Sequence, residues 1–336
     1  MEMPRGIIIF FAATGIIAGM IAADAAARPA HAQALDWPSH SMTLVVPFAA
    51  GGSSDVIARI VADGLSSQLR HPVIVENVSG AGGTTGTNRV AKAAPDGYQF
   101  VIGNVGTFAQ SQWLYRRPLY NAVTDFAPVA LISDEALALV ARKDLPASNF
   151  QEFVAYTKAN QSKLRYSSSG VGGSNHLACM LLNSAIGIDV AHIPYRNVMQ
   201  AIQDLMAGRV DYQCLTLPAA LPQIAAKNLK AIAILSKDRS PGLPDLPSAH
   251  EQGLTDFDIP SWYALFLPRG TPPTIVEKLN RAMIATLEMP SVQRRLKQIG
   301  GDVVAPERRS SEYLAHLVAD EIKKWEAPVK SSGVQF

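Results

Sequence analysis

The chain has 336 residues, of which 48% are hydrophobic and 17% charged, and its formal net charge at pH 7 is +2. This composition is typical of a globular protein, and the near balance of positive and negative side chains argues against a nucleic-acid-binding surface. Without the leader described next, about 300 residues remain, enough for two lobes with separate cores.

The N-terminal segment has the pattern of a secretory signal. A basic residue precedes a mostly apolar run at 6–23, and small residues follow it as far as the overlapping tripeptides Ala-His-Ala and Ala-Gln-Ala at 30–34. This pattern predicts cleavage after Ala32 or Ala34, so residues 1–34 are interpreted as a signal peptide and the mature chain as an exported protein. An uncleaved membrane anchor is the alternative, but the apolar run is at the short end for a bilayer span.

The remaining chain alternates short apolar strands with helices, which indicates an α/β fold with mostly parallel strands. In chain order, we expect strands at 43–47, 72–76, 99–103, 127–140, 164–167, 192–194, 210–215, 229–235 and 262–267. We expect helices at 53–69, 84–94, 149–160, 175–186, 199–207, 273–287, 291–299 and 310–324.

The order of these elements predicts two lobes. The alternation of strand and helix restarts near residue 149, and a returning strand follows near residue 262. The first lobe is therefore assigned to 35–134 plus 261–336, and the second to 135–260. Because the chain enters the second lobe and comes back, we expect a hinge made of two crossovers.

The two cysteines, Cys179 and Cys214, both fall in the second lobe. The first lies on a predicted helix and the second on a predicted strand beneath it, and in an exported chain such a pair can remain oxidised. A disulfide and two buried free thiols both fit this pattern. A catalytic thiol is not favoured, since neither cysteine has a histidine beside it in the sequence.

Glycine-rich loops follow three predicted strands, at 49–53, 79–86 and 167–174. In the first, Gly51 and Gly52 precede a helix that begins at Ser53, so free N–H groups and the positive end of the helix dipole form a potential anion site. An ordinary strand-to-helix turn has the same pattern. The second loop lacks the dinucleotide fingerprint, because Thr85 stands where the third glycine is required, and no phosphate-binding loop motif is present. No cofactor is expected.

The sequence gives little indication of catalysis or metal binding. The run GGSNH at 172–176 begins like a nucleophile elbow but has His176 where the motif requires glycine. His176 is better interpreted as a hydrogen-bonding or packed imidazole at the start of a helix. An exported serine hydrolase using Ser174 and His176 remains the alternative function. No cluster of cysteine and histidine has zinc-site spacing, so no metal is expected.

Six segments occur in the order VVPFAAGGSSDVIAR, VENVSGAGGTTGTNRVAKAAPDGY, LYRRPLYNAVTDFAPV, SSSGVGGSNHLA, IPYRNVMQAIQDLMAGRVDY and SWYALFLPRGTP. Together they resemble the Bug or TctC family, the extracytoplasmic solute receptors of tripartite tricarboxylate transporters. The resemblance runs from about Trp37 almost to the C-terminus. It implies a two-lobed periplasmic-binding-protein fold of type II-like organisation, in a periplasmic, non-enzymatic monomer that binds a small organic carboxylate and delivers it to membrane transporter subunits. Input to a sensor system is the alternative output.

The resemblance also places the ligand between the loop at 48–53 and the loop at 168–176. The ligand-binding residues that it implies are Phe48, Ala50, Gly51, Gly52, Ser53, Asp55, Asn104, Thr107, Ser168, Gly170, Gly172, Ser174, His176 and Arg196. Asp55 is more readily interpreted as a cap of its own helix than as a contact to an anion. Arg196 is either the one cationic contact or a solvated surface arginine.

Two positions depart from the family pattern near the expected cleft: Asn197 follows the PYR triplet in place of glycine, and Phe108 occupies a position that is often polar. If Phe48, Phe108 and Trp262 all face the cleft, an aromatic or longer-chain carboxylate is a reasonable hypothesis, and the expected ligands are a dicarboxylate or an aromatic acid. The alternative is that all three side chains belong to the core.

Overall fold

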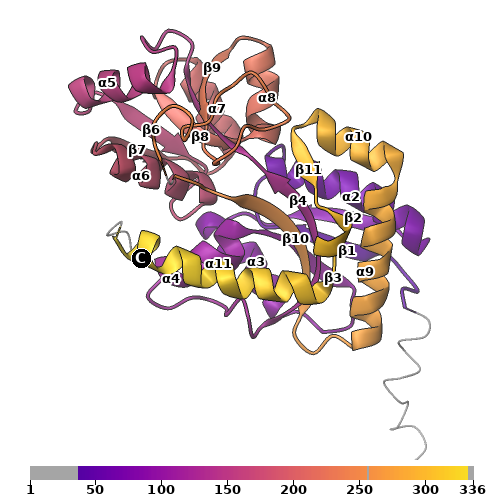
Figure 1. Cartoon of the computed structure of the whole chain (residues 1–336). Helices are drawn as coiled ribbons and strands as arrows, with labels where there is room; N and C mark the ends of the chain where they lie inside the picture. Colours follow the sequence, from indigo (N-terminus) through magenta and orange to yellow (C-terminus); the bar gives the residue numbers. More distant parts are fainter. Residues whose placement is uncertain (1–36, 256, 332–336) are drawn as a thin grey trace, which may run out of the picture. The chain divides into compact units, whose positions relative to one another are not determined.

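The described residues of this computed structural model, 37–255 and 257–331, form two separate β-sheets with helices packed on them (Figure 1). The strand order is β11-β4-β10-β3-β1-β2 in the first sheet and β7-β6-β8-β5-β9 in the second. The predicted leader at 1–34 lies outside the described residues. The description below concerns the unit from Pro38 onward.

Each sheet draws its strands from a different part of the chain. The first sheet contains β1 (Met42–Val46), β2 (Val73–Asn77), β3 (Gln99–Asn104), β4 (Phe126–Glu135), β10 (Ser261–Pro268) and β11 (Gly301–Val303). The second sheet contains β5 (Leu137–Arg142), β6 (Arg165–Ser168), β7 (Ala191–Pro194), β8 (Tyr212–Thr216) and β9 (Leu229–Ile234). We call each sheet and the elements packed on it the first and the second lobe.

The strand directions differ from the sequence prediction. β1 pairs in parallel with β2 and β3, whereas β10 pairs antiparallel with β3 and β4. In the second sheet β6 is parallel to β7 and β8, but β5 is antiparallel to β8 and β9. The two-lobed α/β fold is confirmed, but the expectation of mostly parallel sheets is wrong. The chain leaves the first sheet along β4 and returns to it along β10. These two strands lie side by side, and because one leads out of the sheet and the other leads back in, they run in opposite directions.

The chain passes between the sheets at two places. The segment 127–140, expected as one extended run, is divided at Ala136, so that β4 belongs to the first sheet and β5 to the second. The return ends at Ser261, where β10 begins directly opposite Glu135. Two adjacent crossings of this kind form a hinge about which two lobes can rotate.

The helices cover the sheets. They are α2 (Ser53–Leu69), α3 (Thr84–Ala91), α4 (Ser111–Leu114), α5 (Phe150–Asn160), α6 (Ser174–Ile186), α7 (Val198–Met206), α8 (Leu217–Ala225), α9 (Pro273–Glu288), α10 (Pro290–Gln298) and α11 (Ser311–Ser331), with short helical turns η1 (Ala81–Gly83), η2 (Gly106–Gln110) and η3 (Pro306–Arg308). Helices α2 and α9 approach each other closely at Gly64, where a Cβ atom would lie 2.4 Å from Thr286 Cγ2. A glycine at this position therefore permits the packing that fixes α2, and with it the loop before α2.

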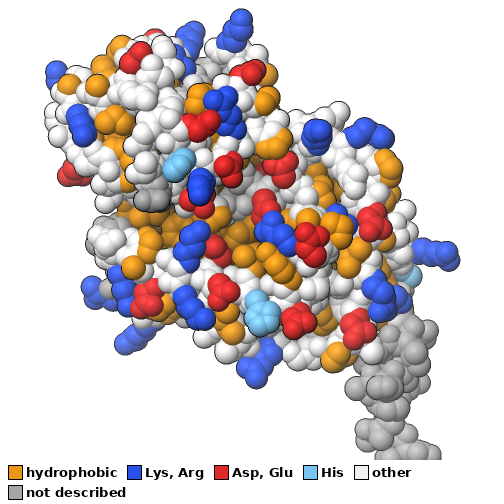
Figure 2. All heavy atoms as spheres, viewed as in Figure 1, with side chains coloured by type: hydrophobic (Ala, Val, Ile, Leu, Met, Phe, Trp, Pro, Cys, Tyr) orange, Lys and Arg blue, Asp and Glu red, His pale blue; other side chains and the backbone are white. Residues whose placement is uncertain are grey.

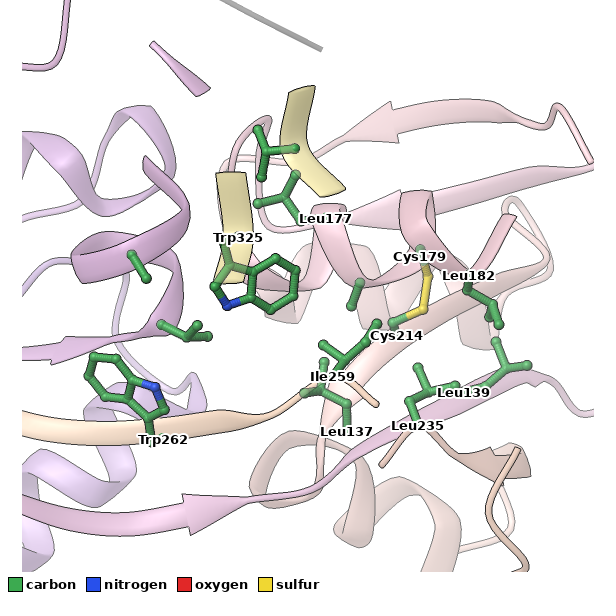
Figure 3. Close-up of a cluster of buried hydrophobic side chains, with 14 of the residues drawn as sticks. Leu137, Leu139, Leu177, Cys179, Leu182, Cys214, Leu235, Ile259, Trp262 and Trp325 are labelled. Atoms are coloured by element: carbon green, nitrogen blue, oxygen red, sulfur yellow. A yellow bond between two sulfur atoms is a disulfide. The ribbon is translucent and has the colours of Figure 1, made fainter. Parts of the chain in front are cut away.

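A large cluster of buried hydrophobic side chains includes residues of both lobes (Figure 3). It contains Leu177 of α6 and Trp325 of α11. Within it, Cys179 of α6 and Cys214 of β8 form a disulfide, with their Cα atoms 5.4 Å apart. The structure therefore has the disulfide rather than the two free thiols that were its alternative.

Charged side chains of both signs are interspersed over the face shown in Figure 2. Within residues 37–255 and 257–331, no helix combines the length and the apolar character needed to cross a membrane.

Candidate ligand-binding site

A cavity of about 500 Å³ is lined by both lobes. The first lobe contributes Asn104, Tyr263 and residues of two loops, at 48–54 and 79–83. The second lobe contributes residues of the segments 169–175, 195–198 and 215–219. Most of these segments connect a strand to the helix that follows it, which is where ligands bind in open α/β sheets.

The amino ends of four helices lie at this cavity. Gly52 and Ser53 begin α2, Ser174 begins α6, Val198 begins α7 and Thr216 precedes α8, and all five residues line the cavity. No side chain caps the amino end of α2 or α6, whereas Asn197 caps α7 by accepting the Gln200 N–H. At α8 the Leu217 N–H already donates to the Ala136 carbonyl, and Pro218 has no N–H. Unpaired N–H groups and aligned peptide dipoles at a helix start favour a negatively charged ligand.

The only charged side chain among the residues that line the cavity is that of Arg196. It follows β7 and is exposed. No aspartate or glutamate within residues 37–255 and 257–331 belongs to the lining. Together with the helix ends, this single guanidinium gives the cavity a positive electrostatic character, which suits an anion with one or two carboxylates.

Polar side chains join the two lobes across the cavity. Ser53 Oγ of the first lobe lies 2.6 Å from Thr216 Oγ1 of the second. The Tyr263 hydroxyl interacts with the side chains of Ser54, Asn104 and Thr216, and burial raises its pKa to about 12. Tyr263 is therefore protonated at neutral pH and can donate one hydrogen bond at this junction.

Two glycine-rich loops meet at the cavity without intervening side chains. A Cβ atom on Gly82 would lie 3.0 Å from Gly172 C and 3.2 Å from Gly173 N of the second lobe. Nearby, a Cβ atom on Gly52 would lie 3.2 Å from Val198 Cγ1. The lobes are thus in direct contact around the cavity, which is the closed arrangement of a two-lobed protein.

Asp55 lies behind the first loop and not in the lining of the cavity. Its carboxylate accepts hydrogen bonds from the Gly51 N–H at 2.9 Å, from Asn77 Nδ2 at 3.0 Å and from Arg59. Burial opposes ionisation, but these hydrogen bonds outweigh it and hold the pKa of Asp55 below its usual value. Since Asn77 also donates to the Phe48 carbonyl, Asp55 and Asn77 hold the loop that precedes α2 in place.

Two stacked histidines lie behind the second loop, with ring centroids 4.1 Å apart. His176 Nδ1 accepts the Gly172 N–H at 3.3 Å, and His192 Nε2 lies 2.7 Å from Ser168 Oγ. Burial lowers the pKa of His176 to about 4, and burial together with the neighbouring His176 lowers that of His192 to about 3. Both rings are neutral at neutral pH, and they position the loop. Because Nδ1 of His176 is engaged by Gly172, this ring is not arranged as a base for Ser174.

Half of the residues that the resemblance placed at the ligand belong to the lining of the cavity: Phe48, Gly52, Ser53, Asn104, Gly170, Ser174 and Arg196. The other half lie outside that lining: Ala50, Gly51, Asp55, Thr107, Ser168, Gly172 and His176. Among the latter, Thr107 exchanges hydrogen bonds with Asn104, and so holds a lining residue in place.

The aromatic side chains divide differently from the first expectation. Phe48 lines the cavity, but Phe108 is fully buried and stacks on Phe266 with ring centroids 3.6 Å apart. Trp262 is only 2% exposed and is also outside the lining. For Phe108 and Trp262 the core interpretation is therefore correct, so that Phe48 is the one of these three aromatic side chains that could contact an aromatic ligand.

Several lining residues were not predicted from the sequence, namely Ser54, Ser79–Gly83, Tyr195, Val198, Thr216 and Tyr263. The loop at 79–83 lacks the dinucleotide fingerprint and was therefore not assigned to the site. Its glycines, which follow a strand, were nevertheless a signal that a ligand or another backbone segment comes close to the loop. Among the described residues, no group of three or more histidines, cysteines or acidic residues is arranged to hold a metal ion.

Two α/β lobes joined by two crossings and closed around a cavity lined by helix amino ends define the class of bilobed periplasmic binding proteins. Comparison with known protein families identifies the family. Residues 57–334 match the model of the family TctC, which is described as "Tripartite tricarboxylate transporter family receptor". The chain belongs to this family.

Solved structures agree with this assignment. The periplasmic binding protein BugD is 36% identical and superimposes with a TM-score of 0.86, covering 89% of this chain and 99% of BugD. MatC from Rhodopseudomonas palustris, solved with bound malate, is 38% identical with a TM-score of 0.84, covering 87% of this chain and all of MatC. Another R. palustris protein, solved with adipate, is 33% identical with a TM-score of 0.84, covering 89% of this chain and 99% of its own. The chain is a solute-binding protein of the Bug and TctC type.

Proposed function

We propose that this protein captures a small organic carboxylate between its lobes and delivers it to the membrane subunits of a tripartite tricarboxylate transporter. The observation that carries the proposal is the cavity itself, where the uncapped amino ends of α2 and α6 and the residue Arg196 line a space with no aspartate or glutamate among its described lining residues. Malate and adipate, bound by two similar proteins, are both dicarboxylates. A dicarboxylate would place one end at the starts of α2 and α6 and the other at Arg196.

The organisation of the chain supports export and closure. We propose that 1–34 is a signal peptide cleaved after Ala32 or Ala34, which leaves a monomeric periplasmic receptor. Its lobes would comprise 35–134 plus 261–336 and 135–260, boundaries that lie close to the crossings at Ala136 and Ser261.

We propose no catalytic role for the cavity. A serine hydrolase would need a base beside Ser174, and the nearest candidate in sequence, His176, already accepts a hydrogen bond from Gly172. The receptor proposal therefore predicts that a bound carboxylate is recovered chemically unchanged. Turnover of an ester by the wild type that disappears in Ser174→Ala would contradict it.

Arg196 gives the sharpest test of the ligand class. We expect Arg196→Gln to weaken binding of malate or adipate about 10- to 100-fold, because a charge-assisted hydrogen bond contributes about 1.5–3 kcal/mol. The measurement is isothermal titration calorimetry on the mature chain with mono-, di- and tricarboxylates. Arg116→Gln is the matched control, since Arg116 is also exposed and lies outside the lining of the cavity. Equal affinities in the two variants would remove Arg196 from the site, and no binding by any carboxylate would contradict the proposal.

A further inference from the structure

Glu135 is a buried carboxyl group at the hinge. It ends β4, one residue before the sheets change, and it is 4% exposed. Its Oε1 accepts a hydrogen bond from Ser133 Oγ at 2.8 Å, whereas Oε2 is buried without a hydrogen-bond partner in the described part of the chain. Ser261, directly opposite on β10, likewise has a buried hydroxyl without a partner there. Burying an ionised carboxylate with an unsatisfied oxygen is costly, so this environment favours the neutral acid.

The segment that covers this carboxyl group is itself in contact with the second lobe. Gly301 of β11 lies directly against it, since a Cβ atom there would be 2.9 Å from Glu135 Oε1. The preceding Gly300 contacts α8 of the second lobe, where a Cβ atom would lie 2.7 Å from Leu221 Cδ1 and 3.0 Å from Leu217 Cβ. This contact joins the two lobes. Separation of the lobes would therefore withdraw α8 from β11 and admit water to the edge of the sheet that covers Glu135.

Three titratable groups face Glu135: Asp134 on its own strand, Asp302 on β11 and the hydroxyl of Tyr263 on β10. The two aspartates favour its neutral form, and Tyr263 is itself neutral at neutral pH. Burial raises the pKa of Glu135 well above its usual range; the hydrogen bond from Ser133 opposes this shift, and the two aspartates add to it. Tyr263, which interacts electrostatically with Glu135, also lines the ligand cavity.

The cations in this region are directed at other carboxylates. Arg308 is paired with Asp134, and Lys297 of α10 acts on Asp302. Within residues 37–255 and 257–331, no lysine, arginine or histidine forms an ion pair with Glu135. Removal of Glu135 from water is thus not compensated by a positive partner.

We propose that Glu135 holds a proton while the lobes are closed and releases it to water when they open, so that closure takes up one proton from the solvent. The carboxylate of the open form and a proton from water or buffer give the carboxylic acid of the closed form, and opening reverses this transfer. Low pH then favours the closed form and high pH the open form. The proposal rests on the proposed function for the ligand that drives closure, but its test needs no ligand.

The test is small-angle X-ray scattering of the ligand-free chain 35–336 between about pH 5.5 and pH 8.5. We expect the radius of gyration of the wild type to increase with pH. Glu135→Gln, which keeps an uncharged side chain of the same shape, should retain the compact value throughout. Asp302→Asn, which removes a neighbouring carboxylate, should still respond to pH. A wild type that does not respond, or a Glu135→Gln variant that follows the wild type, would overturn the proposal.

A second measurement avoids reliance on the variant folding correctly. Malate and adipate are titrated into the wild type in two buffers of different ionisation enthalpy, and we expect the uptake of up to one proton for each ligand bound. Binding without proton uptake would contradict the role of Glu135. Failure of every carboxylate to bind would contradict the receptor proposal instead, and the scattering response to pH would still decide the role of Glu135.

Discussion

Single residues around the cavity fall into those that face the ligand space and those that hold the loops in position. Ser53, Ser174 and Arg196 face the space. Asp55 and His176 lie behind it, where each binds a backbone N–H of a glycine-rich loop. The sequence motif contains both groups, so a motif match alone does not separate a ligand contact from a residue that positions the loop.

The neutral histidines make stability depend on pH. An unfolded histidine takes up a proton near pH 6.5, but His176 in the folded protein does so only near pH 4. The unfolded state therefore binds more protons in this window, and we expect the free energy of unfolding to fall as the pH is lowered from about 6.5 to about 4, by about 3 kcal/mol for His176 alone. Urea denaturation at several pH values measures this loss.

His176→Asn is the variant that assigns this effect, because Asn does not titrate and keeps an acceptor oxygen near the position of Nδ1. We expect it to lose part of the acid sensitivity. The control is His316→Asn, since the side chain of His316 is 77% exposed. If both variants keep the full pH dependence of the wild type, His176 is not its source.

At the same scale, the sequence predicted residues at two strand-to-helix loops and missed those brought in by distant strands and those of the loop at 79–83. Gly52, Ser53 and Ser174 were accessible because a strand, a glycine loop and a helix follow one another along the chain. Thr216 and Tyr263 reach the cavity only through the pairing of strands far apart in sequence. Local patterns carry no information on such pairing.

At the level of elements, the contact between the two glycine loops gives a test of closure. Gly82 has φ of +61°, and a Cβ atom there would press on the backbone of the second lobe. We expect Gly82→Ala to weaken ligand binding by at least about tenfold, because the cost of the contact is borne by the closed form. Titration calorimetry with malate, adipate or another carboxylate that binds the wild type measures the change.

Gly187→Ala is the matched control for this variant. Gly187 has a similar φ of +69°, but no atom lies within 4 Å of a Cβ placed there. Both variants should lose about 1 kcal/mol of stability from the left-handed backbone conformation, but only Gly82→Ala should lose affinity. Equal affinities in the two variants would show that this contact does not limit closure.

The disulfide ties α6 to β8 within the second lobe. Since it closes a loop of 35 residues, its loss in Cys179→Ala/Cys214→Ala should lower the free energy of unfolding by about 2–4 kcal/mol. Urea denaturation of the variant and of the wild type under non-reducing conditions measures the difference. Unchanged stability would contradict a structural role for this bond.

Most helices and strands were predicted close to their observed positions, and the exceptions have physical causes. Helix α8 was missed because it contains Pro218 and Pro222, and proline usually argues against a helix. Pro218 lies in the first turn, where proline is well tolerated. The segment 106–114 forms a π-helical turn and a short α-helix, for which no simple periodicity exists. The short strand β11 exists only by pairing with β4.

At the scale of the whole molecule, the two-lobed fold was predictable because the strand and helix pattern stops, restarts and returns. The mixed direction of the strands was not, since a run of apolar residues does not reveal which neighbour it will pair with. The closed contacts across the cavity, such as Ser53 with Thr216, likewise arise only once both lobes are assembled.

In the proposed function, a carboxylate is held between the lobes and stabilises their closed form. The most direct test is small-angle X-ray scattering of the mature chain at constant pH, with and without a carboxylate that calorimetry has shown to bind. We predict a smaller radius of gyration in its presence, because only the closed form brings the amino ends of α2 and α6 to one ligand. A carboxylate that binds without changing the radius of gyration of an open, ligand-free protein would contradict the claim.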